Sequence, residues 1–163
     1  MQKIFTGLIF ALVAFPAFAG GITYVDKIEN GGGVLKVATY FDATGTRQKI
    51  GLIGISIPGN PNISIAFTAQ EWHTLSDLWA EAVAANFVAT FRGQTKWQTV
   101  GTFNETNTDD PSVLTMSAGQ GVQLVISSPA KGSKTFVVSP ETLTRVNDDL
   151  KRTQTSLNNQ DSE

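Results

Sequence analysis

One stretch of the sequence repeats after 71 residues, and the two copies stay in register from a predicted strand, through a turn, into a helix. Ile55-Ser56-Ile57-Pro58 corresponds to Ile126-Ser127-Ser128-Pro129, and Phe67 at the next strand end corresponds to Val138. The apolar helix positions correspond in pairs: Trp72 and Leu143, Leu75 and Val146, Trp79 and Leu150. Because strand, turn and helix coincide at one offset without a gap, we predict a duplicated supersecondary unit with a shared core.

Eight stretches of alternating or apolar residues, separated by turns rich in Gly, Pro and Asn, predict strands. They lie at 22–29, 34–42, 49–57 and 63–67 in the first unit, and at 97–105, 112–117, 122–128 and 134–138 in the second. A helix follows each set, so the predicted fold class is α+β: two repeated ββββα units whose antiparallel sheets pack with two helices. We expect one compact domain at 20–152, with pseudo-repeats at about 20–92 and 93–152.

Each predicted helix begins at a recognisable cap. Thr68-Ala69-Gln70-Glu71 is a capping box, in which the Thr68 hydroxyl and the Glu71 carboxylate satisfy backbone amides of the first turn. Ser139-Pro140-Glu141 has a hydroxyl residue at the cap, proline at the first helical position and an acidic first turn. We therefore expect hydroxyl caps at both helix starts.

The helix ends are less well defined by the sequence. The first helix ends between Asn86 and Gly93, because Phe87 and Phe91 are compatible either with a continued buried side or with the start of a strand. The second helix is followed by polar residues, and the sequence predicts a frayed polar tail at 153–163.

The first 19 residues have the pattern of a secretory signal peptide. Lys3 gives a positive start, the apolar run at 4–15 follows, and Ala17-Phe18-Ala19 fits a cleavage site before Gly20. A membrane anchor is the alternative, but the run is about a dozen residues long, against the ~20 needed to span a bilayer. We predict cleavage between Ala19 and Gly20 and a periplasmic or secreted protein.

Composition excludes several function classes. The chain has no cysteine, which rules out disulfides and thiolate metal sites. Its formal net charge is −2, and Lys151-Arg152 is the only adjacent pair of basic residues. A mildly acidic protein without a basic cluster has little with which to bind a phosphate backbone, so a nucleic-acid partner is disfavoured.

The order of four strands and one helix, present twice, resembles the tandem unit of the whirly family of single-stranded nucleic-acid-binding proteins. The resemblance covers most of the chain after the predicted signal peptide, at the level of topology. It implies a whirly-like fold and, as one functional possibility, binding of single-stranded nucleic acid. That family's lysine-rich binding motif has no counterpart here, so the resemblance assigns no binding residue.

The residues with catalytic or metal-binding chemistry form no convincing constellation. His73 is the only histidine; Asp77, one turn further along the helix, either orients it as a general base or is merely its solvated neighbour, and we expect the latter. Glu105, Asn107 and Asp109 alternate like the first ligands of a calcium loop, but the glycine and the closing glutamate of such loops are missing. The sequence therefore predicts no catalytic residue, metal or cofactor.

Aromatic residues are the remaining candidates for ligand binding. Trp72 and Trp79 fall on the predicted buried stripe of the first helix. Trp97 and Tyr40 lie on or near strands with one face open to water, where either ring can stack on a sugar or anchor a partner. Trp97 and Tyr40 are thus the candidate ligand-binding residues.

Together these features predict an exported, non-enzymatic binding or structural protein of the cell envelope or medium. Its expected partner is another protein or a second copy of itself, because strand-rich edges and faces pair readily. A carbohydrate-binding module that uses Trp97 or Tyr40 is the main alternative, and single-stranded nucleic-acid binding is the second.

Overall fold

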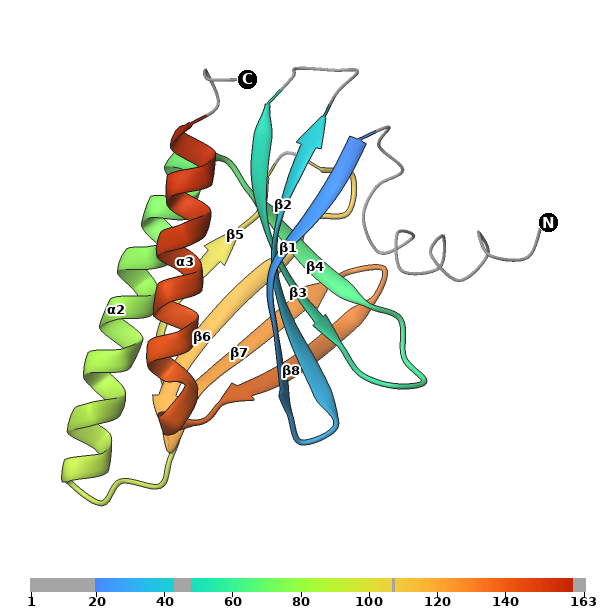
Figure 1. Cartoon of the computed structure of the whole chain (residues 1–163). Helices are drawn as coiled ribbons and strands as arrows, with labels where there is room; N and C mark the ends of the chain where they lie inside the picture. The colour runs from blue at the N-terminus through green and yellow to red at the C-terminus, as the bar shows by residue number, and fades with distance from the viewer. Residues whose placement is uncertain (1–19, 43–47, 107, 160–163) are drawn as a thin grey trace.

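The computed structural model describes residues 20–42, 48–106 and 108–159, and the predicted signal peptide lies outside these ranges. Two four-stranded antiparallel sheets, each followed by a helix, confirm the predicted fold class (Figure 1). The first unit contains β1 (Gly20–Asn30), β2 (Gly33–Asp42), β3 (Lys49–Ser56), β4 (Ile63–Phe67) and helix α2 (Ala69–Phe91). The second contains β5 (Gln98–Asn104), β6 (Val113–Gly119), β7 (Gly121–Ser128), β8 (Gly132–Val138), a short 3₁₀ turn (Pro140–Thr142) and helix α3 (Leu143–Asn158).

The start and the end of α2 are both fixed by local hydrogen bonds. At the start, the Glu71 amide donates to the Thr68 hydroxyl and the Thr68 amide donates to the Glu71 carboxylate, which confirms the predicted capping box. At the end, Gly93 adopts a φ of 64°, and the amides of Gly93 and Gln94 donate to the carbonyls of Thr90 and Ala89. This is a Schellman motif, so α2 continues through Phe91, the last position that its glycine stop allows.

Helix α3 differs from its prediction at both ends. Ser139 precedes the 3₁₀ turn, and its hydroxyl lies 3.2 Å from the Thr142 hydroxyl rather than capping a helix amide. At the other end, the prediction of a frayed tail from Thr153 is wrong over the described residues. The helix extends to Asn158, because Thr153 and Leu157 are both buried against the rest of the protein.

Each helix packs mainly against the sheet of the other unit. Helix α2 lies on β5, β6 and β7, whereas α3 lies on β1, β2 and β3, and the two helices run side by side (Figure 1). Phe67 and Val138, the equivalent strand ends of the two units, are buried in the same hydrophobic cluster. The two units therefore interlock around one core instead of forming two separate ones.

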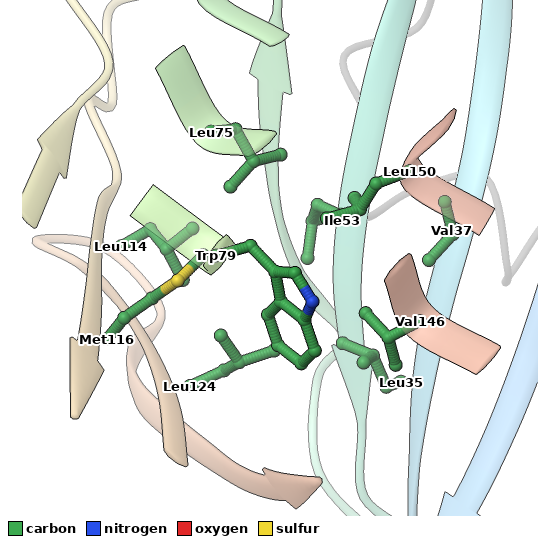
Figure 2. A pocket seen from close by; sticks show the side chains of 10 residues that line it. All are labelled: Leu35, Val37, Ile53, Leu75, Trp79, Leu114, Met116, Leu124, Val146 and Leu150. Carbon is green, nitrogen blue, oxygen red and sulfur yellow. The ribbon is translucent and has the colours of Figure 1, made fainter. Parts of the chain in front are cut away.

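Trp79 occupies the centre of this core. Figure 2 shows its ring between Met116 and Leu124 of the second sheet on one side and Leu35 of the first sheet and Val146 of α3 on the other. The small cavity beside the ring has a volume of about 10 Å³. Its lining is apolar apart from the Trp79 indole N–H, which has no hydrogen-bond partner. A cavity of that size holds at most about one water, so it is a packing defect and not a ligand site.

Among the described residues, no helix is both long enough and apolar enough to cross a membrane.

Candidate functional site

The structure does not assemble the two predicted ligand-binding residues into one site. Trp97 lies in the loop just before β5 and is 38% exposed. Its ring packs over Gly119 of β6, where an added Cβ would come within 2.8 Å of the indole. Tyr40 belongs to β2 in the other sheet. Of these two residues, only Trp97 keeps an accessible aromatic surface.

The burial of Tyr40 corrects the expectation that its face of the sheet is wet. Tyr40 is 4% exposed and packs with Ala38 and Leu52 in a second, smaller apolar cluster. Because side chains alternate along a strand, this cluster lies on the face of the first sheet opposite to Val37 and the main core. The first sheet is thus apolar on both faces, and Tyr40 offers no open ring to a ligand.

His73 and Asp77 lie on the solvent side of α2, as expected for a solvated pair. The His73 Nε2 atom and the Asp77 carboxylate are 3.8 Å apart, and both side chains are largely exposed. An exposed ion pair of this type contributes little energy and excludes no water. The geometry of a general base held against a substrate is therefore missing at His73.

The carboxylates of the polar loop between β5 and β6 have separate structural partners. Glu105 accepts hydrogen bonds from the Ala66 amide at 2.9 Å and the Ser112 amide at 3.4 Å, and burial raises its pKa. Asp110 accepts from the Ser128 hydroxyl at 2.8 Å. Asn107 lies outside the described residues. Glu105 thus covers the edge of β4 while Asp110 fixes the β7–β8 turn, so the two carboxylates do not converge.

A pair of carboxyl groups that the sequence did not reveal joins α3 to β1. Asp26 follows an irregularity in the pairing of β1 with β2, and Arg145 of α3 holds its carboxylate in two hydrogen bonds of 2.6 and 2.7 Å. Asp149 lies one turn further along α3 and is fully buried, and its Oδ2 atom has no hydrogen-bond partner. It is close enough to Asp26 for the two carboxyl groups to affect each other's pKa. Arg152 donates to the same Asp149 carboxyl group.

The environment separates the pKa values of the two acids. The hydrogen bond from Arg145 lowers the pKa of Asp26 to about 2, whereas burial raises the pKa of Asp149 to about 6. Separated pKa values are typical of acid–base pairs in enzymes. Here, however, the Asp149 side chain is 0% exposed and no substrate can reach it. The pair is therefore best interpreted as a polar clamp between α3 and the first sheet.

The outer side of α2 carries an apolar surface that we call the α2 ridge. Phe87 is 72% exposed and Phe91 is 86% exposed, the two highest values among the large apolar side chains that lie open to solvent. The ridge consists of five exposed residues on the side of the helix opposite to the core: Ala80, Ala84, Phe87, Val88 and Phe91. No charged side chain interrupts the sequence from Ala82 to Phe91. Phe87 and Phe91 thus neither continue the buried side nor begin a strand.

Within the described part of the chain, no three His, Asp or Glu side chains gather in a way that could hold a metal ion. Comparison of the sequence with models of protein families and with curated proteins finds no match to either. The α2 ridge and the half-exposed Trp97 are therefore the two surfaces from which a function can be inferred. Nucleic-acid binding, which the whirly resemblance implies, stays a prediction.

Proposed function

We propose that the protein is an exported, non-enzymatic binding protein of the cell envelope or medium, and that it acts through protein–protein contact at the α2 ridge. The observation that carries this proposal is the exposure of Phe87 and Phe91 on a regular, capped helix. Leaving apolar area in water costs roughly 25 cal/mol per Å², and contiguous exposed apolar surface marks interaction sites. A partner that covers both rings would remove this cost.

Two features support a function without catalysis. Asp149, whose carboxyl pKa is raised to about 6, is buried and accepts a hydrogen bond from Arg152. His73, the only histidine of the chain, lies in solvent beside Asp77. Catalysis by acid–base or nucleophilic groups requires such side chains to meet a substrate in a sheltered site, and neither residue meets that requirement.

Photo-crosslinking from the ridge tests the proposal. A photoreactive amino acid at position 87 should give a covalent adduct in the cells that make the protein, whereas the same amino acid at Lys151 of α3 should not. Lys151 is a matched control because it occupies, one repeat later, the exposed helical position of Ala80. Equal yields from both positions, or no adduct from position 87, would refute binding at the ridge.

Trp97 supports carbohydrate binding as a second candidate function. Its indole is partly open to solvent while its other side rests on Gly119, so the ring is held in place as stacking on a sugar requires. Titration with cell-wall glycans should then change the tryptophan fluorescence of the wild type but not of Trp97→Phe. An unchanged signal across a broad glycan panel would eliminate this candidate.

A further inference from the structure

The spacing of the α2 ridge matches the seam of a coiled coil. Ala80, Ala84, Phe87 and Phe91 follow one another at intervals of four, three and four residues, which is the a/d spacing of a heptad repeat. A seam of this kind is used to pack one helix lengthwise against another. The buried stripe of α2 is already occupied by the core, so the ridge is a second packing face on the same helix.

Along the ridge, two small residues are followed by two large ones, so the ridge is complementary in size to a copy of itself that runs in the opposite direction. Ala80 and Phe91 are equally far from a point between Ala85 and Asn86, and so are Ala84 and Phe87. If a second copy of α2 packs antiparallel about a two-fold axis through this point, each phenylalanine ring faces an alanine. A parallel copy would place ring against ring and leave a gap between the alanines, which protein interfaces avoid.

The charges beside the ridge favour the same orientation. Asp77 and Glu81 flank its N-terminal half, whereas Arg92 and Lys96 follow its C-terminal end, and all four are exposed. Glu81 and Arg92 are about three helical turns apart and therefore lie on the same side of α2. In an antiparallel pair related by a two-fold axis, the same sides of the two helices meet, so Glu81 of one copy lies near Arg92 of the other. A parallel pair would leave Glu81 of one copy about 16 Å along the helices from Arg92 of the other and would lose this attraction.

We propose that the partner of the α2 ridge is a second copy of this chain, packed antiparallel through α2 in a two-fold symmetric homodimer. This inference rests on the proposed function and names its partner. The contact uses the same surface on both copies, so it closes at two copies and does not extend into a fibre. Four phenylalanine rings dominate the buried surface, which is on the order of 800 Å². That is less than the roughly 1,200–2,000 Å² that stable specific interfaces bury, so we expect a weak, transient dimer with a dissociation constant of about 1 μM or higher.

The absence of cysteine from the chain makes the geometry directly testable. Under mild oxidation of the purified protein, Ala84→Cys should form a disulfide with its own copy, because the two positions lie close to the two-fold axis. Ala80→Cys should not, since its two copies are about 16 Å apart along the helices. A mixture of Ala80→Cys and Phe91→Cys should form the mixed disulfide. Crosslinking of Ala80→Cys with itself would indicate a parallel contact and overturn the proposal.

Sedimentation velocity over a range of protein concentrations provides the second test. The wild type should shift from monomer to dimer, and Phe87→Ser should weaken the dimer by roughly tenfold or more, as expected for a central aromatic residue. Glu81→Arg and Arg92→Glu should each weaken it, and the double variant should restore it. Unchanged circular dichroism in each variant checks that the fold is intact.

The outcomes separate the dimer from the broader proposal of a binding surface. A monomer at every concentration overturns the dimer, whatever else the ridge binds. If such a monomer still gives an adduct with another protein from position 87, or binds lipid vesicles, the ridge is a binding surface for a different partner. If position 87 gives no adduct as well, the proposed function fails together with the dimer.

Discussion

Helices α2 and α3 occupy equivalent places in the two units, yet the side chains that they turn to solvent have little in common. Their buried positions match: Trp72, Leu75 and Trp79 in α2 correspond to Leu143, Val146 and Leu150 in α3, and all six lie in one core. On the outer side, Ala80, Ala84 and Phe87 correspond to Lys151, Thr155 and Asn158. The difference is thus confined to one face of the helix.

The outer faces suggest a division of roles between the two helices. On α3, the exposed Arg145 reaches back to Asp26 of β1, so a polar side chain helps to hold the helix to the first sheet. On α2, Phe87 and Phe91 are largely exposed. Because both helices need only their buried face to fold, the stability of the fold does not explain the apolar outer face of α2, and this face is the basis of the proposed function.

The largest loss of stability is expected for substitutions in the core, where the two helices are equivalent. Trp79→Ala should lower the free energy of unfolding by about 3–5 kcal/mol and Leu150→Ala by about 2–5 kcal/mol, since each removes a buried side chain at the shared core. Denaturant unfolding measures both values, with Lys151→Ala as an exposed control that should stay within about 0.5 kcal/mol of the wild type. A small effect for only one of the two core variants would show that the helices are not equivalent in the core.

A smaller and pH-dependent effect is expected at Asp149, whose counterpart in α2 is Leu78. Burial raises the pKa of Asp149 from 3.8 to about 6, so the folded protein holds this proton more tightly than the unfolded chain does. Stability should therefore fall as the pH rises through this interval. Asp149→Asn cannot ionise and should lack the fall, with a free energy of unfolding about 3 kcal/mol above the wild type at neutral pH.

Unfolding curves across this pH range check the prediction, with the exposed neighbour Asp148→Asn as the control. The Asp26–Arg145 pair acts in the opposite sense, because the pKa of Asp26 is lowered from 3.8 to about 2. Its stabilisation is complete above the unfolded pKa and is lost as the pH falls toward 2. If the free energy of unfolding of Asp149→Asn changes with pH as that of the wild type does, Asp149 is not the source of the pH dependence.

The smallest expected loss of stability distinguishes the starts of the two helices. Thr68→Ala should cost about 1 kcal/mol, because it removes the hydroxyl that accepts the Glu71 amide. Ser139→Ala should stay within about 0.5 kcal/mol of the wild type, since Ser139 caps no helix amide. Thermal unfolding of the two variants under identical conditions gives the comparison. Equal losses would mean that the 3₁₀ turn needs the Ser139 hydroxyl as much as α2 needs its capping box.

Most of the fold could be predicted because its signals are local. Strands follow from alternation and turn residues, and the Thr68 capping box identifies the start of α2 from four residues alone. The repeat then predicts the second unit from the first. No local pattern predicts that each helix packs against the sheet of the other unit, because this arrangement depends on contacts between residues far apart in the chain.

The functional surfaces were harder to predict for the same reason. A charged residue such as Asp149 is normally exposed, and only the repeat, which aligns it with Leu78, gave any sign of its burial. The burial of Tyr40 is not predictable from β2 alone, because the second apolar cluster of the first sheet also contains Leu52 of β3. The sequence does not reveal that Phe87 and Phe91 are exposed, because apolar residues are usually buried and the orientation of α2 depends on tertiary packing.

The packing of each helix on the sheet of the other unit also affects when the first sheet can fold. Helix α3 follows all eight strands in the described part of the chain, and it covers the sheet formed by the first strands. During synthesis, the first sheet therefore stays without its cover until α3 has been made, and its non-local contacts form late. For a protein that we propose is exported, this delay is useful. A polypeptide whose first sheet cannot fold early stays unfolded enough to pass through a narrow translocation channel, and it folds after translocation.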